Sequence, residues 1–81
     1  MRLPRDVSGR DLARRLEQAF GYRQVHQVGS HIVLQTESPV HHRMAVPDHR
    51  TLRPGTLHGI IRVVAQAQGI PNGEVLARLF G

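Results

Sequence analysis

The stretch YRQVHQVGSHIVLQTE, residues 22–37, predicts a β-hairpin and determines how the rest of the chain must be arranged. Residues 22–28 and residues 31–37 are both rich in β-branched and alternating side chains, which is typical of strands. The two residues between them, Gly29-Ser30, place glycine first in a two-residue loop, as a type II′ turn requires.

This turn fixes the expected register. It pairs Val28 with His31, His26 with Val33, and Val25 with Leu34. Successive side chains of a strand point to opposite faces of a sheet. One face should therefore carry Val25, Ile32 and Leu34 under a covering layer. The other face, open to solvent, should carry His26, His31 and Val33.

The segments on either side of the hairpin supply helices and a third strand. The expected elements are a helix over Gly9–Phe20 capped by Ser8 and stopped by Gly21, a strand over Arg43–Val46 with Met44 and Val46 inward, and helices over Leu57–Gln68 and Gly73–Phe80. The order α-β-β-β-α-α predicts an α+β fold in which helices cover one face of a three-stranded antiparallel sheet. The α-β-β-β-α part is the layout of double-stranded-RNA-binding domains. We expect residues 1–81 to form a single domain, with its core in residues 8–80.

Composition narrows the classes of function. The net charge is +5, and all 11 basic residues are arginine. Arginine binds phosphate through two hydrogen bonds and stacks on bases, which favours a nucleic-acid partner. An acidic protein partner, or a GC-rich genome, would explain the same numbers. The absence of cysteine excludes disulfides, thiol nucleophiles and cysteine-ligated zinc.

No leader, membrane segment or metal site is expected. Residues 1–6 lack an apolar run, and no later run approaches the length of a membrane span, so we expect a cytoplasmic protein without a membrane partner. His41 and His42 are adjacent and would point to opposite faces of a strand, which makes them poor ligands for one ion. We therefore expect no metal and no cofactor, and a solvated loop at these two histidines.

Several short motifs, taken in order, resemble the HicA-like family of toxin mRNA interferases. The matching segments are Ser8-Gly9-Arg10-Asp11-Leu12, Gly21-Tyr22, Gly29-Ser30-His31, Val46-Pro47-Asp48-His49, Leu52-Arg53-Pro54-Gly55-Thr56-Leu57 and Gln68-Gly69-Ile70. The resemblance runs from about Ser8 to Phe80. One departure is the absence of the basic residues that the family often carries before its Gly-Ser-His motif, where this chain has His26, Gln27 and Val28.

The resemblance implies a toxin that cleaves mRNA without a metal, with His31 as its catalytic histidine. It also implies a HicB-type antitoxin that binds the toxin in a hetero-oligomer and occludes the site. Without the resemblance, His31 is most simply a residue that tolerates the end of a hairpin. A binding module of the same fold, which holds RNA or protein without cutting, is the alternative function. A pure interaction subunit recruited by charge is a third.

The chemistry of RNA cleavage fits the residue types present. Histidine exchanges protons near neutral pH, so His31 would act as general base on the 2′-hydroxyl nucleophile or as general acid on the leaving 5′-oxygen. The expected products are a 2′,3′-cyclic phosphate or a 3′-phosphate, together with a 5′-hydroxyl. His26 and His49 are candidates for the second proton transfer or for RNA contact. The alternative for His26 is an ordinary exposed histidine, and the alternatives for His49 are a contact with the antitoxin or a ring that bonds the loop backbone and shapes it. The candidate RNA-binding residues are Ser30, Arg43, Arg50, Arg53 and Thr56.

Overall fold

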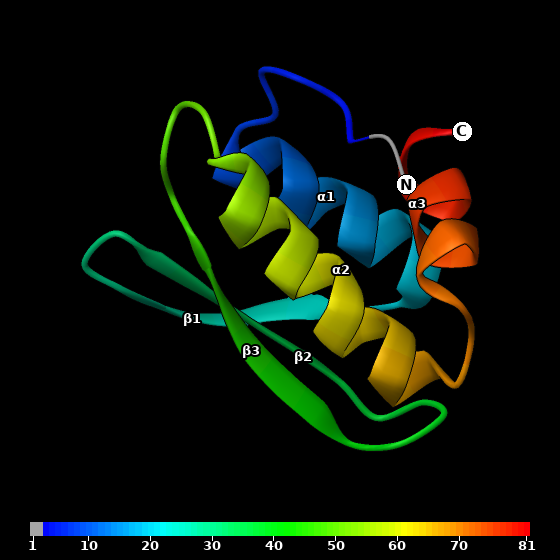
Figure 1. Ribbon diagram of the computed structural model, residues 1–81. Helices are drawn as coiled ribbons and strands as arrows, with labels where there is room; N and C mark the ends of the chain where they lie inside the picture. Colours follow the sequence, from blue (N-terminus) through cyan, green and yellow to red (C-terminus); the bar gives the residue numbers. More distant parts are fainter. Residues whose placement is uncertain (1–2) are drawn as a thin grey trace.

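The computed structural model describes residues 3–81. Its elements follow the predicted order (Figure 1). They are α1 (Gly9–Phe20), β1 (Arg23–Val28), β2 (His31–Thr36), β3 (His42–Pro47), α2 (Pro54–Gln68) and α3 (Asn72–Phe80). The sequence therefore predicts the type of every element, and the bounds differ by three residues or fewer, the largest difference being the start of α2.

Helix α1 begins and ends at the predicted residues. The Ser8 hydroxyl accepts a 3.0 Å hydrogen bond from the backbone N–H of Asp11, which satisfies one of the free donors at the helix start. Gly21 ends the helix in the left-handed conformation, with φ of 71°. The buried side of the helix includes Leu12 and Leu16, both fully shielded from solvent.

The sheet is antiparallel with the order β1-β2-β3, so β2 is central and both other strands are edges. Ile32 and Leu34 on β2 and Val46 on β3 are fully buried on one face. Each such side chain contributes about 1.5–3 kcal/mol when removed from water. The opposite face of the sheet carries no helix and stays open, as predicted.

The expectation for Val25 is wrong. The predicted register holds from Val28↔His31 to His26↔Val33, but Leu34 pairs with Gln24 because the ladder shifts between Gln24 and His26. Val25 is the extra residue of this bulge and is 39% exposed. A bulge places two residues of one strand against one of its partner, which breaks the alternation on which the prediction rested.

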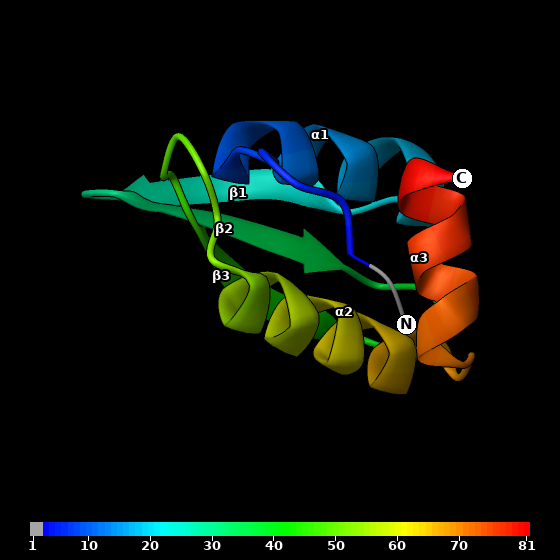
Figure 2. The ribbon, with the colours of Figure 1, turned by 45° about the horizontal axis from the view of Figure 1, so that its top comes forward.

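The helices complete the core on the covered face (Figures 1 and 2). Helix α2 buries the predicted stripe, which consists of Leu57, Ile60, Ile61, Val64 and Ala65. Helix α3 crosses the ends of α1 and α2 and buries Val75 and Leu79 (Figure 2). None of the helices in residues 3–81 combines the length and apolar character needed to cross a membrane.

Candidate functional site

The Gly29-Ser30 turn projects from one end of the sheet, beyond the cover of the helices (Figure 1). Gly29 has φ of 56° and Ser30 does not have a positive φ, as expected for a type II′ turn. His31 follows as the first residue of β2, lies opposite Val28 and Pro47, and is exposed. A large polyanionic ligand could therefore reach the His31 ring from the open face.

A second segment holds the turn in place. The backbone N–H of Asp48 donates a 2.6 Å hydrogen bond to the carbonyl oxygen of Ser30. The carboxylate of Asp48 accepts from Nη2 of Arg10 at 2.8 Å and from Nε2 of Gln27 at 3.3 Å. Asp48 thus connects α1, the end of β1 and the turn before His31.

Sequence reasoning did not identify Asp48, Arg10 or Gln27 as part of this site. Asp48 lies in the Val46–His49 segment, of which only His49 was predicted to be a site residue. One sequence signal was available: Asp48 is one of only six acidic residues in the chain and lies shortly after the predicted third strand.

The start of α1 packs tightly on the same segment. A Cβ atom at Gly9 would overlap the carbonyl oxygen of Pro47, so only glycine fits there. The backbone N–H of Gly9 donates to the carbonyl of His49 at 2.9 Å, and that of Leu52 donates to Val7 at 2.8 Å. These contacts fix the backbone of His49, while its side chain remains exposed.

His26 and Arg43 share the open face with His31 but lie at different distances from it. His26 pairs with Val33, which makes it a diagonal neighbour of His31, about 7–8 Å away. Arg43 pairs with Gln35, four residues along β2 from His31, which corresponds to about 13 Å. His26 is therefore the nearer of the two to His31, and Arg43 lies well beyond it along the sheet.

Arg50, Arg53 and Thr56 follow the segment that holds the turn, and all three are exposed. Arg53 occupies the N-cap position of α2 but makes no side-chain capping hydrogen bond. Thr56 lies within the first turn of the helix and not at its cap, because α2 begins at Pro54. Neither arginine forms an ion pair within residues 3–81, so both are available to an anion.

At the end of the sheet far from His31, the expectation of a solvated loop is wrong for His42, which is half-buried. His42 is the first residue of β3, and its Nδ1 atom lies 2.7 Å from the hydroxyl of the buried Tyr22. Burial, together with the charge of His41, lowers the pKa of His42. Burial raises the pKa of the Tyr22 hydroxyl. At neutral pH, His42 is therefore uncharged, and its Nδ1 atom shares a hydrogen bond with the Tyr22 hydroxyl, which keeps its proton.

His41 makes a separate contact with Glu37, whose Oε1 atom lies 3.0 Å from Nδ1 of His41. Hydrogen bonds from His41 and Gln35 lower the pKa of Glu37. Within residues 3–81, no three histidine, aspartate or glutamate side chains gather closely enough to hold a metal ion.

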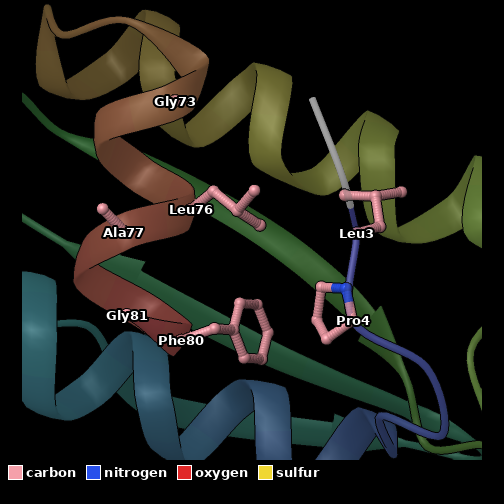
Figure 3. Close-up of a pocket in the computed structure, with 7 residues that line it drawn as sticks. All are labelled: Leu3, Pro4, Gly73, Leu76, Ala77, Phe80 and Gly81. Atoms are coloured by element: carbon pink, nitrogen blue, oxygen red, sulfur yellow. The ribbon is translucent and has the colours of Figure 1, made fainter.

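An apolar groove of about 430 Å³ lies elsewhere, between the N-terminal segment and α3 (Figure 3). Leu3 and Pro4 face Leu76 and Phe80 across it. Its lining includes no titratable side chain, and α3 lies at the end of the molecule opposite the hairpin turn (Figure 1). The groove is thus separate from the histidine site.

The end of the sheet that carries His31 is therefore built from the turn before His31, the segment after β3 and the start of α1. All three segments lie within the residues that match one protein family. Residues 9–67 match the model of a family described as the HicA toxin of bacterial toxin–antitoxin systems. No curated protein and no solved structure matches the chain significantly. The family match covers more than half of the chain, from α1 nearly to the end of α2, and on this evidence the chain belongs to the HicA toxin family.

Proposed function

We propose that the chain is an endoribonuclease toxin that cleaves mRNA without a metal ion, with His31 as its catalytic residue. The observation that carries the proposal is the position of His31. His31 is exposed on the open face, beside a turn that the backbone of Asp48 holds, while the Asp48 carboxylate bonds Gln27 on the adjoining strand. An accessible histidine on a strand next to a held turn suits proton transfer to or from a bound substrate.

The reaction needs two proton transfers. A base takes the proton of the RNA 2′-hydroxyl, and its oxygen attacks the adjacent phosphorus. The new P–O2′ bond forms as the P–O5′ bond breaks, and an acid protonates the leaving 5′-oxygen. His31 performs one transfer, and His26, its diagonal neighbour, performs the other. The products are a 2′,3′-cyclic phosphate and a 5′-hydroxyl.

The developing charge on the phosphorane requires donors on the same side of the site. Ser30 adjoins His31, and the exposed guanidinium groups of Arg50 and Arg53 follow the segment bonded to Ser30. The exposed side chains of Thr56 and His49 flank these arginines. Arginine suits this role because it donates paired hydrogen bonds to phosphate oxygens.

Family membership implies a partner antitoxin, and we propose that it is a HicB-type protein that covers His31. An exposed catalytic histidine on a flat face has no lid of its own, so an inhibitor must supply the cover from outside. Such a complex would be a hetero-oligomer in the cytoplasm, where its mRNA substrate is made.

The test is induced expression of wild-type chain, His31→Gln and His58→Gln, with growth and total mRNA integrity as readouts. His58 lies on α2, away from the open face, and serves as the matched histidine control. We expect arrest and mRNA loss from wild type and His58→Gln only. Equal effects of all three chains, or none from any, would reject His31 catalysis and favour a binding module of the same fold.

A further inference from the structure

The open face of the sheet carries a row of long polar side chains far from His31. Strand pairing places Arg23, Gln35 and Arg43 side by side across β1, β2 and β3. Both arginines are exposed, and neither forms an ion pair with any residue of the described chain, 3–81. The row therefore presents two free guanidinium groups on a surface without a helix.

The arginines of α1 are differently placed. Arg10 pairs with Asp48 at 2.8 Å, and Arg15 pairs with Asp11 at 2.9 Å. Arg14 lies 3.8 Å from the same Asp11 carboxylate. Acidic neighbours thus offset much of the positive charge on α1. The layout is that of double-stranded-RNA-binding domains, but the free charge lies on the sheet and not on this helix.

The surface between His31 and the arginine row is small and largely apolar. His26, Val33 and Ala45 form the intervening row across the three strands. The row of Arg23 and Arg43 is about 13 Å from His31 along β2. A few nucleotides of single-stranded RNA span this distance, with sugars and bases over the apolar strip and phosphates at its basic end.

We infer that a single-stranded segment of the RNA substrate lies across the open face, from His31 at one end to Arg23 and Arg43 at the other. The inference rests on the proposed function, because it extends the same substrate beyond the cleaved bond. A flat basic surface can follow a flexible strand but offers no element that enters a duplex groove. The two arginines bind backbone phosphates and hold the strand in position for His31.

Glu37 limits this interaction. Its Oε2 atom accepts a 2.7 Å hydrogen bond from Nε2 of Gln35, the middle residue of the row. The pKa of Glu37 is lowered, chiefly by hydrogen bonds from His41 and Gln35 and to a smaller extent by the charge of Arg23. The carboxylate therefore stays ionised beside the proposed phosphate path, and its removal should strengthen RNA binding.

The test measures binding apart from cleavage. All variants are made in the His31→Gln background, and fluorescence anisotropy follows a labelled single-stranded RNA and the matching duplex. Arg23→Ala/Arg43→Ala is compared with Arg14→Ala/Arg62→Ala, which removes the same charge from exposed positions on the helices. Circular dichroism confirms that each variant is folded.

We expect the sheet variant to bind single-stranded RNA about tenfold more weakly, with the salt slope reduced by about 1.4 for two lost phosphate contacts. The helix variant should bind within about twofold of the parent. Glu37→Gln should bind about threefold more tightly at low salt. We also expect the parent to bind the single-stranded RNA more tightly than the matching duplex.

Three outcomes would overturn the inference. They are equal losses in the two arginine variants, absence of RNA binding by the parent at low salt, and a sheet variant that binds RNA normally but no longer binds the antitoxin. The last outcome would make the face a protein interface. The proposed chemistry fails by a different result, which is RNA cleavage by the His31→Gln variant. That result would not change the conclusions drawn from the anisotropy measurements.

Discussion

The carboxylate of Asp48 lies 2.8 Å from Nη2 of Arg10, so the segment after β3 is joined to the first turn of α1. The same carboxylate receives Gln27, and the backbone of Asp48 holds Ser30. Three elements distant in sequence therefore meet at one residue beside His31. The pair is partly exposed, so its direct contribution to stability is about 0.5–1 kcal/mol. Its larger effect should be on the geometry of the turn.

Replacing Asp48 by Asn should reduce RNA cleavage more than it reduces stability. The substitution removes the charge that holds Arg10 and Gln27, and we expect kcat to fall about tenfold with little change in KM, because a displaced His31 slows proton transfer. Asp11→Asn is the matched control, since Asp11 pairs with Arg15 on α1 at 2.9 Å. It should cost similar stability and leave cleavage unchanged. Equal cleavage by both variants would contradict a positioning role for Asp48.

Gly9 should not tolerate a side chain. Alanine favours helices over glycine, yet at Gly9 its Cβ would overlap the carbonyl oxygen of Pro47 and lie 2.8 Å from the carbonyl carbon. We expect Gly9→Ala to lower the free energy of unfolding by about 2–3 kcal/mol. Gly59→Ala, in the interior of α2 with open space around its Cβ, should instead raise it by about 0.5–1 kcal/mol. Urea denaturation of both variants measures the contrast, and a stabilising Gly9→Ala would show that the packing at Pro47 is looser than described.

The partial burial of His42 beside Tyr22 should make stability depend on pH. Burial, together with the charge of His41, holds the pKa of His42 below its ordinary value of 6.5, so the unfolded chain binds the proton more readily than the folded one. The contribution of neutral His42 to the free energy of unfolding should therefore be complete above about pH 6.5 and should be lost as the pH falls through the lower pKa of the folded state. The pKa of Glu37 is also lowered by folding, so protonation of Glu37 should reduce stability only below its ordinary pKa of 4.5.

Thermal unfolding between about pH 7.5 and 5 tests this dependence. His42→Gln should flatten the curve, since glutamine can accept the Tyr22 hydrogen bond without titrating. His58→Gln, on α2, should leave the slope of the wild type intact. A slope that persists in His42→Gln would assign the pH dependence to another group.

Local sequence signals were enough for most of the fold. The Ser8 cap, the Gly21 stop and the Gly29-Ser30 turn each depend on contacts within a few residues, and each is present. The bulge at Val25 was not predictable, because a bulge inserts one unpaired residue into a strand and the alternating pattern of β1 gives no sign of it. Similarly, the side-chain partner of His42 is Tyr22, twenty residues away, so neighbouring residues give no signal of this contact.

The candidate site was predictable only in part, for the same reason. The motif around His31 is local, so its turn could be placed from sequence. Its support is not local: Arg10 and Asp48 are separated by 38 residues. Arg23 and Arg43 lie in one row across the sheet only because the register of β1 shifts at the bulge. A regular, unshifted strand would have placed Arg23 opposite Thr36, on the other face.

The proposed chemistry requires a 2′-hydroxyl at the cleaved bond, and this gives a test independent of any protein variant. A substrate with a 2′-O-methyl group has no proton to remove and no free nucleophile, so cleavage at a modified nucleotide should fall at least about a thousandfold. Binding should change little, because most contacts are made with phosphates. Mass spectrometry of an unmodified substrate should find a 2′,3′-cyclic phosphate. A 5′-phosphate product would mean that water attacks in place of the 2′-hydroxyl, and neither His31 nor His26 would then have the role assigned to it.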